Sequence, residues 1–326
     1  MKCFAVIGMG SIAKRHIANL RFLYPEDKIF VVSSSGKNRN EIEGIDAVVE
    51  IDQLISINPS YVIVASPAPF HVDTARMLLE KNISVLIEKP LASTYNASAA
   101  FEIFCKSKKR EAKIGVGYCL RFLPSARFVK EYLENDQLGV LYNVECNVGQ
   151  YLPEWRADKS YKESVSASKA LGGGALLELS HELDFLLWML GDLTLQYSRL
   201  RCTHELELDV EEIADLILVS QKGVYVSVHL DFIQKFTQRK CEFIGEKGRL
   251  VWDLVENSVK LYRSKLVETL YLDVDYDKNK MYIDMLRAFE NLEQQEFDKI
   301  ATVESSTKVM KLIDEAKQFN ARGGIA

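Results

Sequence analysis

The sequence of 326 residues has no apolar run approaching the roughly 20 residues that a membrane-spanning helix needs. Its six cysteines are scattered and form no C-x-x-C pair, so we expect reduced thiols and neither disulfides nor a zinc-ribbon site. Basic residues are not in excess: 41 Lys and Arg stand against 46 Asp and Glu, which argues against a polyanion as the main partner. The opening Met1–Ile7 is too short for the apolar core of a secretory signal. We therefore predict a cytoplasmic protein that binds no nucleic acid, no membrane and no metal.

What the sequence does contain is typical of a folded globular protein. Hydrophobic residues make up 48% of the chain and charged residues 27%. A chain of this length predicts about two domains. We find no internal repeat and no low-complexity tract, so the domain boundary has to be located from the pattern of elements.

The first third alternates short apolar runs with helical patterns. Val62–Ala65 is apolar at every position, which is typical of a strand buried on both faces. In residues 72–81 the apolar side chains share one helical stripe. This alternation predicts a doubly wound α/β domain with a parallel sheet over residues 1–119. The expected strands are Cys3–Ile7, Ile29–Val32, Ala47–Val49, Tyr61–Ala65, Ser84–Ile87 and Lys113–Val116.

Residues 120–326 follow a different pattern, which we interpret as an α+β domain with a mainly antiparallel, open sheet. The polar stretch over residues 150–170 has little periodicity and is interpreted as a binding loop. The last helix is free to pack back on the first domain. Strands are expected over Val140–Val148, Ile213–Ser220, Val224–Phe232, Cys241–Ile244, Leu250–Leu254 and Ser258–Tyr262. Helices are expected over Pro124–Asn135, Ala175–Leu190, Lys280–Gln295 and Ser305–Ala321.

A glycine-rich turn follows the first predicted strand and opens a helix. The segment from Gly8 to Ala13 gives the pattern G-x-G-x-x-A. Gly8 permits the tight turn, Gly10 lets the backbone approach a pyrophosphate, and Ala13 lets the helix pack closely on the sheet. Backbone N–H groups at the helix start, from Ser11 and Ile12 onward, attract phosphate. We therefore predict a site for NAD or NADP.

The end of the second predicted strand should select between the two cofactors. An acidic residue there would hold the ribose 2′-hydroxyl of NAD. This chain has hydroxyls and cations instead: Ser33, Ser34, Ser35, Lys37 and Arg39. Guanidinium and ammonium groups suit a 2′-phosphate, so we predict a slight preference for NADP. The alternative, that Lys37 and Arg39 are solvated loop charges, stays open.

Three further motifs carry a resemblance to a known family. Ala65-Ser66-Pro67-Ala68-Pro69-Phe70-His71 ends the fourth predicted strand, Ile87-Glu88-Lys89-Pro90 ends the fifth, and a segment from Gly172 to Asp184 opens a helix of the second domain. With the glycine-rich turn, they resemble the glucose-fructose oxidoreductase and inositol dehydrogenase family (Gfo/Idh/MocA) over nearly the whole chain. The resemblance implies a Rossmann domain and an NAD(P)-dependent dehydrogenase of sugars, cyclitols or sugar nucleotides. It places Lys89 beside the nicotinamide and His181 beside the substrate hydroxyl.

The chemistry of these residues agrees with that assignment. Oxidising an alcohol removes a hydride and a proton, and histidine suits the proton because its ordinary pKa lies near neutrality. The family often has Asp where this chain has Leu177, so Glu178 is the candidate for that carboxylate. Helical spacing would place Glu178, His181 and Asp184 on one face, where Glu178 or Asp184 would orient the imidazole and assist the proton transfer. Taken alone, His181 would also fit a structural histidine, and Lys89 a solvated lysine.

Two further sets of contacts are predicted with less support from the pattern. For the cofactor they are Ser66, Pro67, His71, Glu88 and Lys89, with His71 equally suited to a structural role. For the substrate they are Tyr118, Arg121, Trp155, Arg156, Tyr161 and Lys169, because aromatic faces and cations suit a sugar. Each substrate residue fits a loop anchor equally well.

Two other functions stay open. One is a redox-neutral enzyme on the same fold, in which hydride transfer is a transient step of glycoside cleavage. The other is a nicotinamide-dinucleotide sensor without chemistry, against which the presence of Lys89 and His181 counts. Segments such as Val224–Val228 alternate and give the open sheet an apolar side. We therefore expect a homodimer or homotetramer.

Overall fold

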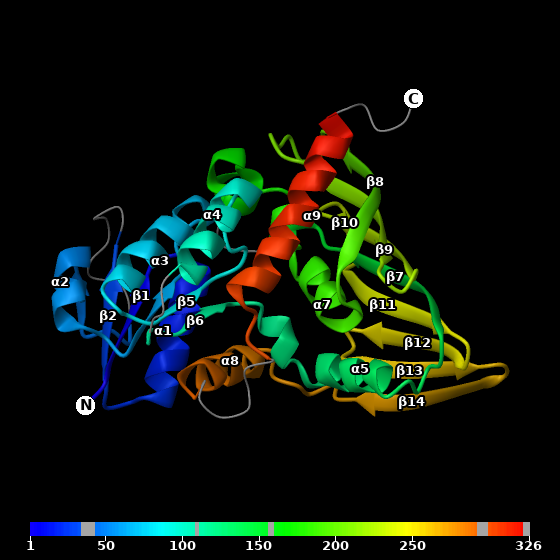
Figure 1. Ribbon diagram of the computed structural model, residues 1–326, viewed down its shortest axis with the longest axis horizontal. Helices are drawn as coiled ribbons and strands as arrows, with labels where there is room; N and C mark the ends of the chain where they lie inside the picture. The colour runs from blue at the N-terminus through cyan, green and yellow to red at the C-terminus, as the bar shows by residue number, and fades with distance from the viewer. Residues whose placement is uncertain (34–42, 108–110, 156–159, 292–298, 322–326) are drawn as a thin grey trace. The chain divides into compact units, whose positions relative to one another are not determined.

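The computed structural model describes residues 1–33, 43–107, 111–155, 160–291 and 299–321 (Figure 1). These residues form two compact units. The first unit combines Met1–Cys119 with Lys278–Met310, and the second combines Leu120–Asp277 with the chain from Lys311 on. The last helix, α9 (Val303–Ala321), therefore contributes residues to both units.

A six-stranded parallel sheet forms the centre of the first unit. Its strand order, β3-β2-β1-β4-β5-β6, is that of a doubly wound fold. The strands are β1 (Cys3–Ile7), β2 (Lys28–Val32), β3 (Ala47–Val49), β4 (Tyr61–Val64), β5 (Val85–Ile87) and β6 (Ile114–Val116). Every residue of β4 is buried, as its uninterrupted apolar sequence predicts. The fold predicted for this part of the chain is confirmed.

Helices cover the faces of this sheet. They are α1 (Ser11–Leu23), α2 (Ile51–Ile57), α3 (His71–Glu80), α4 (Tyr95–Lys106) and α8 (Lys280–Glu290). Helix α1 packs against β1, β2 and α8, whereas α3 packs against β4, β5 and α4. An isolated antiparallel bridge joins Val116 of β6 to Ala301 and attaches the segment before α9 to the sheet. The helix predicted over Lys280–Gln295 ends at Glu290, and residues 292–298 lie outside the described part of the chain.

The second unit is built on an eight-stranded sheet with the order β14-β13-β12-β11-β7-β10-β9-β8. Among the described strand pairs of this sheet only β7–β10 is parallel, so the predicted, mainly antiparallel sheet is confirmed. Strands β8 and β14 are additional to the predicted ones. The strands are β7 (Leu141–Gly149), β8 (Leu193–Arg201), β9 (Ile213–Ser220), β10 (Tyr225–Asp231), β11 (Gln238–Gly245), β12 (Gly248–Asp253), β13 (Ser258–Arg263) and β14 (Leu266–Leu272).

Three helices cover one face of the second sheet: α5 (Pro124–Glu134), α6 (Ala175–Glu178) and α7 (His181–Leu190). Helix α5 contacts β13, β14 and α7, and α6 contacts β9 and β10. Trp252 of β12 is fully buried. It donates from Nε1 to Ser125 Oγ of α5 over 3.0 Å, and it meets the Phe185 ring of α7 edge-on. The core of this unit therefore lies between the helices and one face of the sheet, and the other face is open.

The end of α9 covers an edge of the second sheet. Asn320 Oδ1 accepts a hydrogen bond of 2.9 Å from the backbone N–H of Leu200 on the outer strand β8. The ring of Phe319 packs edge-on against Tyr197 of the same strand. A backbone donor that would otherwise be free on an edge strand is thereby satisfied.

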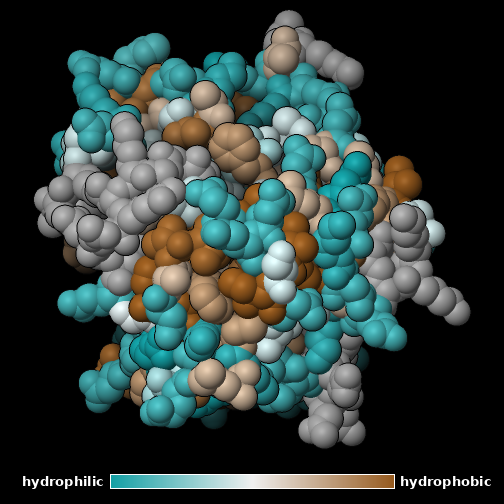
Figure 2. Space-filling view, turned by 90° about the vertical axis from the view of Figure 1, so that its left-hand side faces the viewer, coloured by the Kyte–Doolittle hydropathy of each residue, from teal (hydrophilic) through white to brown (hydrophobic). Residues whose placement is uncertain are grey.

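The surface combines hydrophilic and apolar areas. Figure 2 shows hydrophilic side chains over most of the face turned to the viewer and apolar side chains gathered near its centre. Single exposed apolar residues are ordinary in globular proteins; Phe22 and Ile103 are examples in the first unit. In the part of the chain that the structure describes, no helix has both the length and the hydropathy needed to cross a bilayer.

Candidate active site

The glycine-rich turn lies between β1 and α1 and accepts only glycine at its first position. Gly8 has a φ of +121°, and a Cβ there would lie 2.5 Å from the carbonyl oxygen of Ala65. The N–H of Gly8 donates to the Val32 carbonyl over 3.1 Å. Because Val32 ends β2 and Ala65 follows β4, the turn contacts the carboxyl ends of both neighbours of β1. Open α/β sheets bind their ligands at this edge.

The N-terminus of α1 is suited to an anion. Gly10 caps the helix without a side-chain hydrogen bond, and the first turn carries no acidic side chain. Apart from Gly10 itself and its chain neighbours, no described residue has a heavy atom within 4 Å of the position that a Gly10 Cβ would take. The backbone N–H groups of Ser11, Ile12 and Ala13 belong to this open helix end. These residues therefore fit the phosphates of a dinucleotide.

The residues predicted to select the cofactor are only partly visible. Ser33 follows β2, and its buried hydroxyl has no hydrogen-bond partner among the described residues. Four other residues predicted to contact the cofactor lie outside the described part of the chain: Ser34, Ser35, Lys37 and Arg39. Arg156, which is predicted to contact the substrate, also lies outside it.

The Glu88-Lys89-Pro90 turn follows β5 and is attached to α1 by a buried contact. Glu88 Oε1 lies 2.6 Å from His16 Nε2, and Glu88 Oε2 accepts a hydrogen bond of 3.1 Å from the backbone N–H of Lys89. Both carboxylate oxygens are thus engaged inside the protein, and the predicted contact of Glu88 with the cofactor stays a prediction. The side chain of Glu88 holds the backbone from which Lys89, itself half-buried, projects.

His71 belongs to the same edge. Its Nδ1 lies 2.9 Å from the carbonyl oxygen of Pro90, and its Nε2 lies 2.6 Å from that of Ser66. Burial lowers the pKa of His71, while the two carbonyl contacts act in the opposite direction. The ring thus connects the segment after β4, which includes Pro67, to the turn after β5. Both ring nitrogens of His71 are therefore engaged within this edge.

In the second unit, a glycine run leads into α6. Gly174 has a φ of +107°, and a Cβ there would lie 2.4 Å from Glu211 Oε1. The same oxygen accepts a hydrogen bond of 3.2 Å from the backbone N–H of Leu176 in the first turn of α6. A side chain at position 174 would therefore displace the carboxylate that caps this short helix.

The helix predicted over Ala175–Leu190 is two helices. Helix α6 ends at Glu178, and α7 begins at His181. Leu179 and Ser180 separate them, and Leu179, with a φ of −98° and a ψ of 27°, lies outside the regular α-helical values. Glu178 and His181 therefore belong to two helices, which corrects the prediction of one continuous helix over Ala175–Leu190. The side chains of both residues are half-buried.

Asp184 and Arg121 form a buried, bidentate ion pair. Arg121 Nε donates to Asp184 Oδ2 over 2.8 Å, and Nη2 donates to Oδ1 over 2.6 Å. Burial raises the pKa of Asp184, and the Arg121 charge opposes that rise. The pair thus fixes both side chains inside the second unit, and the roles predicted for Arg121 at the substrate and for Asp184 beside an imidazole stay predictions.

Two of the aromatic residues predicted to contact a substrate have structural partners. Trp155 donates from Nε1 to the Gln150 carbonyl over 3.3 Å, and Tyr161 donates from its hydroxyl to the Leu206 carbonyl over 3.3 Å. Lys169 is exposed, and its backbone N–H donates to a carboxylate over 3.2 Å. Tyr118, in the first unit, is buried. Trp155 and Tyr161 thus hold the loop that follows β7, the second of the two roles open to them.

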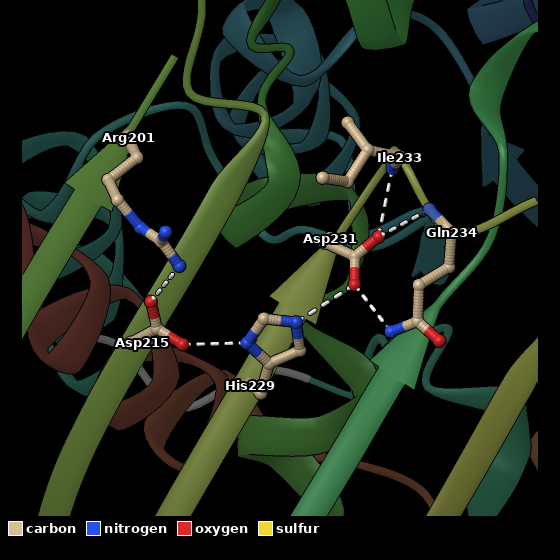
Figure 3. Close-up of polar contacts among 6 residues, drawn as sticks. All are labelled: Arg201, Asp215, His229, Asp231, Ile233 and Gln234. Atoms are coloured by element: carbon tan, nitrogen blue, oxygen red, sulfur yellow. Dashed lines mark hydrogen bonds and ion pairs between the residues drawn. The ribbon is translucent and has the colours of Figure 1, made fainter. Parts of the chain in front are cut away.

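A polar cluster on the open face of the second sheet was not predicted (Figure 3). His229 of β10 lies between two carboxylates, with Nδ1 2.6 Å from Asp215 Oδ1 and Nε2 2.9 Å from Asp231 Oδ2. Arg201 donates to the other oxygen of Asp215 over 2.7 Å. The hydrogen bond to Asp231 raises the pKa of His229, and Asp215 adds to the rise against the effect of burial. Asp231 also accepts from Gln234, so the cluster fixes the turn after β10.

Sequence reasoning missed three other residues that organise these sites. His16, the partner of Glu88, lies three residues after Ala13, and this spacing on the buried face of α1 was the available signal. Glu182 and Arg239 form an ion pair of 2.7 Å in the second unit. Arg239 lies two residues before the buried Cys241 in β11, so the two side chains share one face of the strand. A charged residue on the apolar face of a strand was the available signal there.

Comparison with known proteins identifies both parts of the chain. Residues 2–118 match the family model described as an oxidoreductase family with an NAD-binding Rossmann fold. Residues 126–251 match the GFO/IDH/MocA C-terminal domain. The two matches lie in order along the chain and together cover most of it.

Individual relatives are more distant. The chain is 28% identical over 131 residues to the rhizopine catabolism protein MocA of Rhizobium meliloti, which covers 40% of this chain and 38% of that protein. It is 24% identical over 193 residues to glucose-6-phosphate 3-dehydrogenase of Bacillus subtilis strain 168, covering 58% and 54%. These matches thus span about half or less of the two curated relatives.

A solved structure of levoglucosan dehydrogenase in complex with NADH has 18% sequence identity to this chain and a TM-score of 0.83, and the match covers 99% of this chain and 97% of that one. At this identity the likeness shows the fold. The family itself rests on the two sequence matches, which cover the glycine-rich turn, the Glu88-Lys89-Pro90 turn and His181. The chain belongs to the Gfo/Idh/MocA oxidoreductase family.

Proposed function

We propose that this protein is an NAD(P)-dependent oxidoreductase that transfers a hydride between the nicotinamide and an alcohol or ketone of a sugar, cyclitol or sugar nucleotide. The observation that carries the proposal is the turn after β1, where Gly8 excludes any side chain and the start of α1 carries no cap and no acidic residue. Relatives named glucose-6-phosphate 3-dehydrogenase and levoglucosan dehydrogenase support the substrate class.

Lys89 and His181 are the residues that we propose to handle the proton. Bound NAD(P) supplies the hydride acceptor or donor, so the chain has to take or return the proton of the hydroxyl. Lys89 is suited to this role because the carboxylate of Glu88 holds its backbone at the end of β5. His181 begins α7 with a half-buried imidazole. Glu178 and Asp184 are the proposed assisting carboxylates, of which Asp184 is held in place by Arg121.

We further propose a slight preference for NADP over NAD. The segment from Ser33 to Arg39 contains no carboxylate that would hold a ribose 2′-hydroxyl. It contains two cations that would pair with a 2′-phosphate. Calorimetric titration of the protein with each dinucleotide tests the preference, and tighter binding of NAD would refute it.

For the substrate we propose contacts from the loop that follows β7. Lys169 is exposed there, and the hydrogen bonds of Trp155 and Tyr161 to backbone carbonyls hold the loop in shape. An ammonium group on such a loop suits a sugar that carries a carboxylate or a phosphate. Replacing Lys169 by Met should raise the KM of an anionic sugar more than that of a neutral one, and an equal change for both would contradict the role.

We propose that the open face of the second sheet is covered in a homodimer or homotetramer. Apolar side chains on this face are only half-buried within the chain; they include Ile217, Val219, Ile244 and Val251. Burying such residues against a second copy removes apolar surface from water. Light scattering at micromolar concentration tests this proposal, and a monodisperse monomer would contradict it.

The experiment that tests the proposed activity compares Lys89→Met with the native protein. The variant should bind dinucleotide with unchanged affinity and lose hydride transfer by about 10²–10⁴-fold, the usual contribution of a positioned acid or base. Lys81→Met, at an exposed position after α3, is the matched control and should retain full activity.

The outcomes separate the three functions considered. Retained turnover by Lys89→Met would remove this residue from the mechanism. Tight dinucleotide binding with no reduction by any sugar, cyclitol or sugar nucleotide would favour a sensor. Glycoside cleavage without net change in the absorbance of reduced nicotinamide would indicate a redox-neutral enzyme.

A further inference from the structure

The first turn of α7 is held by two ion pairs, each with a buried carboxylate, on either side of His181. Glu182, the next residue, has a side chain that is only 1% exposed, and its Oε1 accepts from Arg239 Nε over 2.7 Å. Asp184 is held by the two hydrogen bonds from Arg121. Arg239 belongs to β11, and Arg121 lies just before α5. The two pairs therefore attach one helical turn to two different parts of the second unit.

The directions of these side chains determine how far the helix can rotate about its axis. Successive residues of an α-helix are separated by about 100° around the axis. Glu182 therefore lies about 100° from His181 on one side, and Asp184 lies about 60° from it on the other. His181 falls inside the arc of about 160° between the two carboxylates. Any roll of α7 that moves His181 has to stretch at least one of the ion pairs.

Arg239 is an unusual residue for its position. It lies on the side of β11 whose next members, Cys241 and Phe243, are fully buried and apolar. Among the described residues, Glu182 Oε2 has no hydrogen-bond partner, so Arg239 is the group that orients this carboxylate. A buried ion pair generally adds no more stability than well-packed apolar side chains of the same volume. What it adds is direction, because a hydrogen bond fixes an angle that an apolar contact leaves free.

We propose that Glu182 and Arg239 are positioning residues, which fix the roll of α7 and thereby the direction of the His181 side chain. This inference rests on the proposed role of His181 in proton transfer. It extends that proposal to a residue pair that acts through the helix and not at the reacting atoms.

The decisive variant replaces both partners by apolar side chains of similar length, Glu182→Met together with Arg239→Met. Glu182→Gln alone should lower the thermal midpoint, because it removes the carboxylate charge that Arg239 Nε contacts. The double variant should regain a thermal midpoint near the native one, since no buried charge is left unpaired. Its kcat should nevertheless stay roughly 10- to 100-fold below native, the usual effect of a misplaced group, with dinucleotide binding unchanged.

The matched control is Val226→Ala in β10. Val226 is fully buried in the same sheet, so its truncation destabilises the unit and leaves both ion pairs in place. If stability alone governed activity, this control and Glu182→Gln would lose kcat together. A double variant with native thermal midpoint and native kcat would overturn the proposal.

A second measurement needs no activity. The chain has five histidines, and ring-labelled ¹⁵N spectra resolve them, with His181 assigned by its loss in His181→Gln. In the Met/Met variant the His181 signals should shift or broaden, while those of His71 and His229 stay in place. Unchanged His181 signals would overturn the positioning role. If His181 responds but the native protein oxidises or reduces no sugar, cyclitol or sugar nucleotide, the positioning role stands and the proposed function fails.

Discussion

Replacing Arg121 by Met removes the partner of a buried carboxylate and provides a quantitative test of the second unit. The Arg121 and Asp184 side chains are 5% and 2% exposed, and the substitution breaks both of their hydrogen bonds. Removing one member of a buried ion pair costs about 3–5 kcal/mol, because the remaining charge is left uncompensated. At about 2–4 °C per kcal/mol for a unit of this size, the thermal midpoint should fall by about 6–20 °C.

The loss of stability in Arg121→Met should also depend on pH. Burial raises the pKa of Asp184 and Arg121 opposes the rise, so removing Arg121 should raise this pKa further. Consider pH values between the pKa of Asp184 in the unfolded chain and its pKa in the folded variant. In this range the folded variant keeps a proton that the unfolded chain has released. Stability falls as pH rises through that interval. The deficit relative to the native protein should therefore be larger near about pH 8 than near about pH 5.

Urea titrations followed by tryptophan fluorescence measure this deficit in the right unit. The three tryptophans, Trp155, Trp188 and Trp252, all belong to the second unit. Arg249→Met is the control, because Arg249 is half-exposed and its 3.2 Å contact with Glu242 should contribute about 1 kcal/mol or less. A deficit for Arg121→Met below about 1 kcal/mol, or one that is the same at both pH values, would refute the reasoning.

Two further substitutions test the cofactor turn and the open sheet face. Gly8→Ala places a Cβ 2.5 Å from the Ala65 carbonyl oxygen at a φ of +121°. Dinucleotide binding should therefore weaken at least about tenfold, while the circular dichroism spectrum stays native. Native dinucleotide affinity in calorimetry would contradict this prediction. The pKa of His229 is raised in the folded state, so its stabilising effect is complete below the unfolded pKa and is lost as pH rises through the folded pKa. His229→Gln should therefore lose more stability near about pH 6 than near about pH 9. A urea midpoint that falls below the native midpoint by the same amount at both pH values would contradict the assignment.

The parallel sheet and its cofactor turn were predictable because their signals are local. A strand buried on both faces has to be apolar at consecutive positions, as β4 is. The turn after β1 requires glycine at position 8 for steric reasons that involve only its immediate neighbours. Strand β8 carried a usable signal as well, since Leu193 and Leu195 alternate with polar residues, and it was overlooked.

The ion pairs around the candidate site were not predictable in the same way. Arg121 and Asp184 are 63 residues apart, and His16 and Glu88 are 72 apart. Nothing in local periodicity selects one distant partner from many charged residues, so neither pairing was predicted. Burial of both partners in the folded chain is what makes these pairings necessary.

The break between α6 and α7 illustrates a different limit. The sequence from Ala175 to Leu190 keeps helical periodicity throughout, and no proline or glycine interrupts it. The glycine run and Glu211 instead fix a separate first turn through tertiary contacts. Periodicity therefore predicted one continuous helix where the folded chain has two.

The central claim, hydride transfer to or from a nicotinamide, is tested most directly by isotope transfer. A panel of sugars, cyclitols and sugar nucleotides that carry deuterium at each secondary alcohol carbon is incubated with the protein and NADP or NAD, and the dinucleotide is analysed by mass spectrometry. The account predicts deuterium on the nicotinamide with the native protein and none with Lys89→Met, although both bind the dinucleotide. Binding of dinucleotide by the native protein without deuterium transfer from any of these substrates would contradict it.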